Sequence, residues 1–177
     1  TIQKLEYDSD FITTVNQSFA HQLPHSPGTN YVVLQGPNNL RISPKGTLHW
    51  VPIITQVDLN TVIVEAKTAQ QTIEHLLNIY VNAPPVISYQ PAPREVVTQN
   101  TKFQFQFQSF DMNTDAKLQW AHISNSDTSQ FIINQFGMLE FDTIDKLDNF
   151  TYVIHLNDTI DKDIFIGELY INDPPKI

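Results

Sequence analysis

The sequence has no cysteine, and its 177 residues include only five glycines and ten lysines and arginines. The absence of cysteine excludes a disulfide framework, a thiol nucleophile and a metal site with cysteine ligands. Five glycines are too few for a glycine-rich phosphate loop in addition to isolated turns. Nineteen acidic residues give a net charge of −9, which argues against binding to a nucleic-acid backbone.

Long apolar runs and common catalytic motifs are also missing. No run approaches the roughly 18 residues of a membrane span, and the first residues lack the apolar region of a signal peptide. There is no G-x-S-x-G nucleophile elbow and no H-E-x-x-H zinc motif. The six histidines are spread along the chain, which favours strand packing or surface exposure over zinc binding. We therefore expect no membrane insertion of this segment, no enzymatic activity and no catalytic residues.

Alternating apolar and polar residues dominate what is present. Phe103, Phe105 and Phe107 alternate with glutamines, and Val62, Val64 and Ala66 alternate likewise, which predicts half-buried strands. Turn residues separate these short runs, as in a β-sandwich. The segment 73–81 is ambiguous, because its apolar residues fit both a helical and a strand period.

An internal repeat resolves this ambiguity and predicts two domains. Four segments recur in the same order: Asn16–Phe19 as Asn100–Phe103, Leu40–Trp50 as Phe131–Phe141, Thr61–Val64 as Thr151–Ile154, and Ile79–Ile87 as Leu169–Ile177. The repeat predicts domains at 1–85 and 86–177, each with about seven strands. Because 164–169 in the second copy is strand-like, 73–81 is predicted to be a strand, and Gly167 is predicted to form a bulge. The Pro-Pro linker after Asn82 predicts a stiff connection and a rod-like pair.

Three segments of the first copy carry a family resemblance: Leu40–Pro52, Thr61–Ala66 and Ile79–Pro85. The second copy keeps the same frame in Phe103–Asp111 and Phe131–Phe141. These segments resemble the putative-Ig and dystroglycan-type cadherin-like repeats of extracellular and bacterial envelope proteins. The resemblance implies two tandem Ig-like, Greek-key β-sandwiches in an exported protein that contains further repeats. It also implies a role in spacing, adhesion or carbohydrate contact, and no chemistry.

Acidic residues in two loops of the second copy suggest a calcium site. The Asp111-Met-Asn-Thr-Asp115 spacing resembles the acidic loop by which cadherin-like repeats bind calcium, whereas Ala116 and His122 exclude an EF-hand. In a seven-stranded sandwich this loop and the last interstrand loop share one end. The predicted calcium ligands, at the end of the second copy that faces the linker, are Asp111, Asn113, Asp115, Asp158, Asp161, Asp163 and Asn82. The alternative is that these acids are exposed loop residues that aid solubility. Residues 87–177 carry −7 of the net charge of −9.

Other features leave the binding partner open. We expect Trp50 and Trp120 to lie in the cores, and Tyr7 and Tyr89 to be the aromatic residues that could stack on a sugar ring. The Phe/Gln segment 103–108 would offer an aggregation-prone or peptide-binding edge if it lies at the side of a sheet. Glycosylation sequons occur at Asn16, Asn149 and Asn157. We expect a non-enzymatic spacer or adhesion-type module of an exported protein, bound to a protein or glycan through loops or a sheet edge. The alternative is an accessory carbohydrate-binding module.

Overall fold

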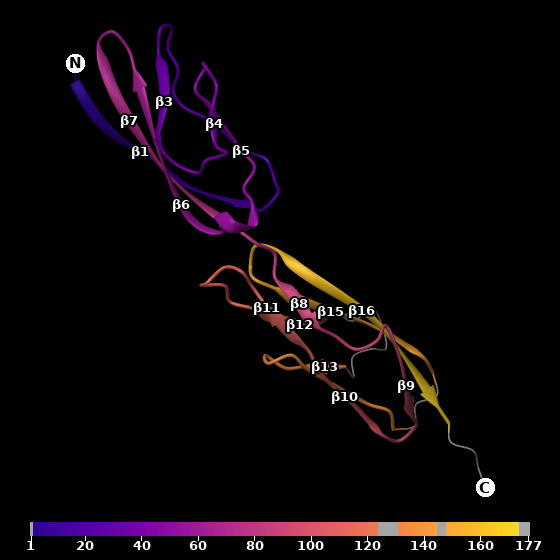
Figure 1. Cartoon of the computed structure of the whole chain (residues 1–177). Coiled ribbons are helices and arrows are strands. Elements are labelled where there is room, and N and C mark those ends of the chain that lie inside the picture. Colours follow the sequence, from indigo (N-terminus) through magenta and orange to yellow (C-terminus); the bar gives the residue numbers. More distant parts are fainter. Residues whose placement is uncertain (1, 124–130, 145–147, 174–177) are drawn as a thin grey trace. The chain divides into compact units, whose positions relative to one another are not determined.

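The computed structural model describes residues 2–123, 131–144 and 148–173, with side chains from Asp10 onward. The chain divides into two compact units, Thr1–Ala83 and Pro84–Ile177 (Figure 1). Among the described residues the only helical segment is one 3-10 turn, η1 (Ile54–Gln56), and no helix is long and apolar enough to cross a membrane.

The first unit consists of two sheets. The strands of its four-stranded sheet follow the order β1-β7-β6-β3, and those of its three-stranded sheet follow the order β2-β5-β4. The β1 strand runs parallel to β7, and the other pairs are antiparallel. The strand bounds are β1 Ile2–Thr14, β2 Phe19–Gln22, β3 Asn30–Gln35, β4 Arg41–Ile42, β5 Thr47–Trp50, β6 Asp58–Lys67 and β7 Gln71–Asn82.

Alternate side chains of both sheets form the core of the first unit. Val62 and Val64 on β6 and Leu77 and Ile79 on β7 are fully buried, in one cluster with Trp50 from the other sheet. The period of two that was visible in the sequence therefore places one face of each strand in the core. This arrangement confirms the all-β sandwich prediction.

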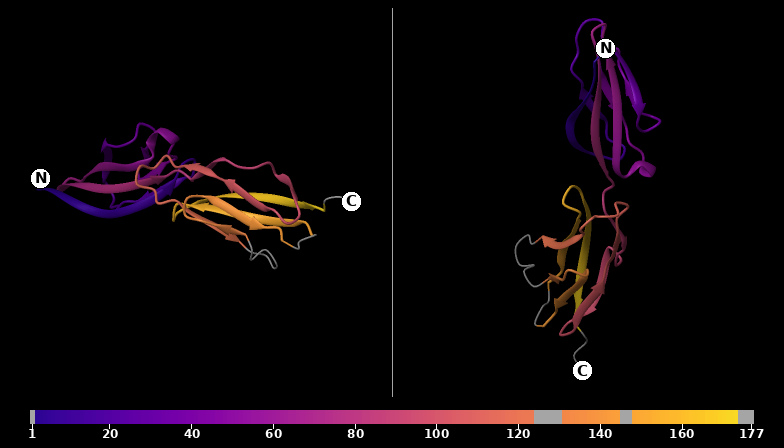
Figure 2. Two further views of the ribbon diagram at one scale, coloured as in Figure 1. Left: turned by 90° about the horizontal axis from the view of Figure 1, so that it is seen from below. Right: turned by 90° about the vertical axis from the view of Figure 1, so that its left-hand side faces the viewer.

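The second unit has the same plan with its first strand divided in two. Its four-stranded sheet has the order β12-β15-β16-β9, its three-stranded sheet has the order β10-β14-β13, and β11 pairs with β8. The β16 strand runs almost the length of this unit in both views of Figure 2. The strand bounds are β8 Val86–Tyr89, β9 Arg94–Thr98, β10 Lys102–Gln106, β11 Gln108–Phe110, β12 Gln119–Ile123, β13 Ile132–Ile133, β14 Met138–Asp142, β15 Phe150–Asn157 and β16 Lys162–Asn172.

The second core is richer in aromatic rings than the first. The Phe131 ring stacks on the rings of Phe141 and Tyr152, with centroids 4.1 and 4.8 Å apart. Phe107 meets Phe165 edge to face at 5.5 Å. Such ring pairs add to the stabilisation that comes from burial alone.

The repeat is visible in the backbone as well as in the sequence. Asn16 and Asn100 both have left-handed backbone angles, with φ of 63° and 61°, before the equivalent strands β2 and β10. Gly46 and Gly137 have φ of 84° and 81° in the equivalent turns before β5 and β14. Asparagine and glycine are the residues that tolerate this region best, so the repeated positions share a conformational cause.

Two equivalent glutamines hold these turns to the neighbouring strand. The Gln22 side-chain amide donates to the Lys45 carbonyl oxygen at 2.8 Å, and the Gln106 amide donates to the Phe136 carbonyl oxygen at 2.7 Å. Both glutamines lie three residues after the repeated phenylalanine. The shared contact extends the repeat beyond the positions that the sequence comparison had identified.

Two details differ from the sequence-based expectation. Gly167 is not a bulge, because the register of β15 and β16 is continuous through the Tyr152–Gly167 pair. A Cβ atom at Gly167 would lie 2.4 Å from Cζ of Tyr152, so the glycine makes room for that ring. The predicted strand 103–108 is divided into β10 and β11 at Phe107, whose backbone N–H donates to the Gly137 carbonyl oxygen at 2.9 Å. The prediction of a strand over 73–81 is confirmed by β7.

Candidate functional site

The outer side of the four-stranded sheet is unusually apolar in each unit, and we call it the open face of that unit. In an antiparallel sheet with one wet side, polar residues are expected there. In the second unit, Ile123, Val153 and Ile166 instead form one continuous row across β12, β15 and β16. Ile123 is 41% exposed and Ile166 is 60% exposed. The row therefore presents apolar surface from three adjacent strands to solvent.

The next row of the second unit's open face contains a histidine. His155 on β15 lies between Ala121 on β12 and Ile164 on β16, and Ile164 is also exposed. Burial, and after it the Lys162 ammonium group, holds the pKa of His155 below its usual value of 6.5. The imidazole is therefore preferentially neutral, which keeps this row uncharged near neutral pH.

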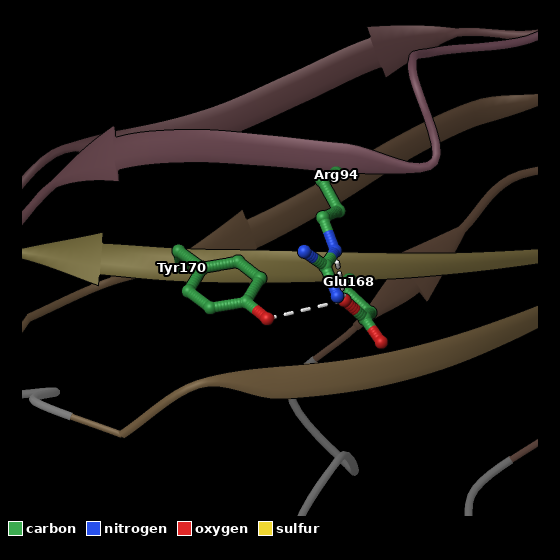
Figure 3. Close-up of polar contacts among 3 residues, drawn as sticks. All are labelled: Arg94, Glu168 and Tyr170. Carbon is green, nitrogen blue, oxygen red and sulfur yellow. Dashed lines mark hydrogen bonds and ion pairs between the residues drawn. The ribbon is translucent and has the colours of Figure 1, made fainter.

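A small polar cluster crosses the open face beside the apolar rows (Figure 3). Arg94 on β9 pairs with Glu168 on β16, with Nε and Oε2 2.8 Å apart, and the Tyr170 hydroxyl donates to the same carboxylate oxygen at 3.2 Å. The Arg94 guanidinium lies 5.6 Å from the centroid of the Tyr170 ring. Val96, in register with Tyr170, is exposed. Tyrosine and arginine are the residues most enriched in the energetic centres of protein interfaces.

The first unit repeats this pattern. Ile12, Tyr80 and Leu59 form an apolar row across β1, β7 and β6, and Ile12 and Leu59 are both more than half exposed. Ile63 and Leu76 form a second, half-buried pair on the same face. Both units thus place apolar rows on the outer side of the equivalent sheet.

The outer sides of the three-stranded sheets are polar by contrast. In the second unit Glu140 accepts a hydrogen bond from the Gln104 side-chain amide at 2.5 Å and pairs with the Lys102 ammonium group at 2.9 Å. In the first unit the Thr47 hydroxyl donates to the Gln22 side-chain oxygen at 2.6 Å. Apolar rows that cross adjacent strands therefore characterise the four-stranded sheets, whereas the three-stranded sheet of the second unit has Ile132 exposed beside Glu140.

The predicted calcium ligands of the second unit lie in two loops and at the start of β16. Asp158 Oδ1 accepts hydrogen bonds from the backbone N–H groups of Ile160 and Asp161, at 2.7 and 2.6 Å, so it closes its own loop. Asp111 Oδ1 accepts in the same way from the N–H of Asn113 at 2.8 Å. These bonds are Asx turns, which supply a structural reason for aspartate at both positions.

The start of β8 lies beside both acidic segments, because Phe110 pairs with Val86 and Asp163 contacts Ile87. Asp163 Oδ2 accepts a hydrogen bond from the Ile87 N–H at 2.8 Å and so ties β16 to the first strand of the unit, whereas Asp115 is exposed. Asn82 is buried at the end of β7 in the first unit. Within the part of the chain that the structure describes, no three His, Asp or Glu side chains are grouped so that they could hold a metal ion. Calcium binding at these residues stays a prediction.

The aromatic residues divide between core and surface. Trp50 is 2% exposed, as predicted, and Trp120 is half-buried against the second core. Tyr89 is 54% exposed and stacks on Phe105 with centroids 5.4 Å apart. The side chain of Tyr7 lies outside the described residues. Carbohydrate binding at Tyr89 stays a prediction.

The structure also locates the Phe/Gln strand and the glycosylation sequons, and it contains a cavity in the first unit. The Phe/Gln strand β10 lies at one side of its sheet, as edge pairing would require. The sequon residues Asn16, Asn149 and Asn157 are all exposed. A cavity of about 180 Å³ lies at the loop end of the first unit, between the segment from Pro24 to Thr29 and the turn between β6 and β7. Its lining is mainly apolar and includes His25 and the buried His75.

Sequence reasoning did not identify the open faces. One signal was present, because Ile164, Phe165 and Ile166 on β16, like Tyr152, Val153 and Ile154 on β15, are consecutive apolar residues. Such a run is typical of a strand that is covered on both sides. The structure covers one side with the core and leaves Ile164 and Ile166 on the other.

Two units of this topology define a pair of tandem Ig-like β-sandwiches. No family model and no curated protein matches the sequence. Solved structures that resemble the chain are extracellular domains 3–5 of Drosophila OTK, with a TM-score of 0.68 and 15% identity over 93% of this chain and 59% of that one. The I-band fragment I67–I69 of titin gives 0.61 and 13% over 94% and 64%. The eight N-terminal Ig domains of DSCAM isoform 1.30.30 give 0.67 and 12% over 98% and 24%.

These similarities concern the fold. The chain spans 59% and 64% of the length of the first two of these structures, both of which contain three domains by their descriptions. Ig-like tandem domains are thereby confirmed, whereas the cadherin-like and dystroglycan-type character stays a prediction.

Proposed function

We propose that this chain is a non-enzymatic protein-interaction module of a longer exported protein, and that the open face of its second unit is the binding surface. The observation that carries this proposal is the apolar row in which the half-buried Val153 lies between the exposed Ile123 and Ile166. Contiguous apolar surface on a soluble domain marks interaction sites, whereas single exposed apolar residues are ordinary. The similar OTK structure consists of extracellular domains, which supports an exported location.

The energetics favour a protein partner over a small ligand. Complete burial of an Ile side chain contributes about 1.5–3 kcal/mol, and Ile164 and Ile166 each have much of their surface still exposed. The open face is a sheet surface, whereas small-molecule sites are concave. Arg94, Glu168 and Tyr170 lie beside the apolar rows and could fix the orientation of a partner.

We further propose a spacing role for the pair of units. Three residues, Ala83, Pro84 and Pro85, connect the end of β7 to the start of β8. The two prolines have restricted backbone angles. A linker this short and stiff would limit hinge motion and present the binding face at a set distance along the parent chain.

Site-specific photo-cross-linking tests the proposal. A benzophenone amino acid replaces Ile166 on the open face or, as the matched control, Ile132 on the outer side of the three-stranded sheet, where the exposure is 63% against 60% for Ile166. The probe is the purified chain in extracts and on the surface of its source cells. We expect position 166 to give a saturable protein adduct that unlabelled chain competes away, and position 132 to give at least tenfold less. Equal yields at both positions, or no adduct at 166, would contradict the proposal.

A further inference from the structure

We propose that the open face of the second unit binds the same face of a second copy of this chain. This inference rests on the proposed function and names its partner. Residues 87–177 carry a net charge of −7, while the open face carries almost none of it. Among the described residues of the four strands, the ionic side chains on the outer side are Arg94, Lys162 and Glu168.

The distribution of charge restricts the chemistry of the partner. A basic partner would be drawn to the acidic surface elsewhere on the unit and would gain little from the open face. A polar partner would leave its own groups unsatisfied against Ile123, Val153 and Ile166. The face therefore fits a flat surface that is apolar, β-structured and poor in charge, and a second copy of the face itself meets each of these conditions.

The charged residues beside the apolar rows of the open face are compatible with two-fold symmetry. An interface between two copies that are related by a two-fold axis uses the same patch twice, so the patch must complement itself. Arg94 and Glu168 supply one cation and one anion on each copy, and both side chains remain partly exposed in the single chain. Either residue can therefore exchange its partner within the copy for one in the other copy without leaving a buried charge unpaired.

The area of the open face determines how strongly we expect two copies of the chain to associate. Three strands, β12, β15 and β16, lie side by side about 4.8 Å apart over five residues at about 3.3 Å each, which gives a flat area of roughly 250 Å². The β9 strand lies beside β16 only from Glu168 onward. Stable interfaces bury about 800 Å² on each partner. The pairing is therefore weak, and we expect a dissociation constant in the range of about 10 µM to 1 mM.

Sedimentation velocity of the full chain from about 5 to 500 µM tests the inference. We expect the weight-average sedimentation coefficient to rise with concentration, and to rise more at 300 mM than at 50 mM NaCl, because salt screens the repulsion between two chains of net charge −9. A basic contaminant bound to the acidic surface would show the opposite salt dependence. A chain that stays monomeric at 500 µM in both salts would overturn the inference.

Two matched variants locate the contact. Ile166→Lys places a charge in the open face, and Ile132→Lys makes the same change at an equally exposed residue of the other sheet. Both reduce the net negative charge by one, which by itself favours association. We expect at least a tenfold weaker association for I166K and no loss for I132K, with unchanged circular dichroism in both. Association that I166K leaves intact, or that both variants abolish, would overturn the inference.

A third substitution tests whether a weaker association of I166K comes from loss of the contact or from a local folding defect at Ile166. Val96→Lys changes an exposed residue at the β9 side of the same face, and it should weaken association as well. If the chain is monomeric while position 166 still cross-links a different protein, the self-pairing inference fails and the proposed function stands. If no protein cross-links at 166, both fail.

Discussion

At the scale of single residues, Gly167 determines whether Tyr152 fits the second core. A Cβ atom at Gly167 would lie 2.4 Å from Cζ and 2.6 Å from the hydroxyl oxygen of Tyr152, and 2.8 Å from a ring carbon of Phe165. Tyr152 is 1% exposed, and its burial raises the pKa of its hydroxyl above the usual value of 10.0. The ring therefore has no open solvent to move into.

We predict that Gly167→Ala lowers the free energy of unfolding of the second unit by about 1–3 kcal/mol, the range for overpacking a core. Urea denaturation followed by tryptophan fluorescence measures this cost, with Trp120 reporting on the second unit and Trp50 on the first. The control is the same substitution in a Tyr152→Leu background, where the clash with the phenol is gone and the cost should fall by at least half. An equal cost in both backgrounds would show that the ring contact is not the cause.

Two histidines of the second unit make its stability depend on pH. Burial lowers the pKa of His122, and burial together with Lys162 lowers the pKa of His155. Below about pH 6.5 the unfolded chain binds protons that the folded unit resists, so the free energy of unfolding falls as pH decreases from 6.5 toward the lowered folded values. Above pH 6.5 both states are neutral at these positions and the effect vanishes.

We predict that the loss of melting temperature between pH 7.5 and pH 5.5 is smaller in His122→Gln and in His155→Gln than in the unaltered chain. Differential scanning calorimetry of the three proteins provides the comparison. His21→Gln serves as the control, since it makes a similar change in the other unit. Identical acid sensitivity in all four proteins would mean that neither histidine contributes.

The residue scale also shows where sequence reasoning succeeds. The repeated Asn16 and Asn100, and Gly46 and Gly137, could be found from the sequence because a left-handed backbone angle selects the same residue types twice. The role of Gly167 could not, because it depends on which ring stands opposite on the neighbouring strand. A bulge and a close approach of a neighbouring ring both place a glycine in an apolar strand, so the sequence alone does not distinguish them.

At the scale of strands and loops, the predicted calcium ligands have a competing structural role. Asp111, Asp158 and Asp163 accept backbone hydrogen bonds within the second unit, so their presence is explained without a metal ion. Asp115 is the exposed carboxylate of the set, so its substitution removes the least buried side chain. It is therefore the residue at which metal binding and folding can be separated.

If calcium binds as the sequence predicts, 2 mM calcium should raise the melting temperature of the second unit by several degrees relative to EGTA. Asp115→Ala should abolish this rise without changing the melting temperature in EGTA. Asp148→Ala, at an exposed acid outside the predicted set, should leave the rise intact. An unchanged melting temperature on addition of calcium to the unaltered chain would refute the site.

The strand scale explains why the fold was accessible from sequence while the open face was not. Alternation and the repeat determine which side of β6, β7 and β15 enters the core, and those assignments agree with the burial of Val62, Leu77 and Ile154. The break between β10 and β11 depends on a hydrogen bond from Phe107 to the distant Gly137. The exposure of Ile166 likewise depends on the absence of a second layer, which no local pattern records.

At the scale of the whole molecule, charge and apolar surface are separated. Residues 87–177 carry 13 acidic and 6 basic groups, yet the open face of the second unit has Glu168 as its acid among the described residues. Strong net charge keeps a protein soluble and opposes nonspecific association. An apolar face that carries little of this charge is suited to a specific contact, because such a contact has to form although the net charge opposes association.

The central claim is that this open face, and not the rest of the surface, makes the contact with a protein partner. The most direct measurement is the ratio of photo-cross-linking yields at Ile166 and Ile132, two isoleucines of nearly equal exposure on opposite sheets of one unit. We predict a ratio of at least ten, with the adduct at Ile166 lost when unlabelled chain is added in excess. A ratio near one would contradict the claim.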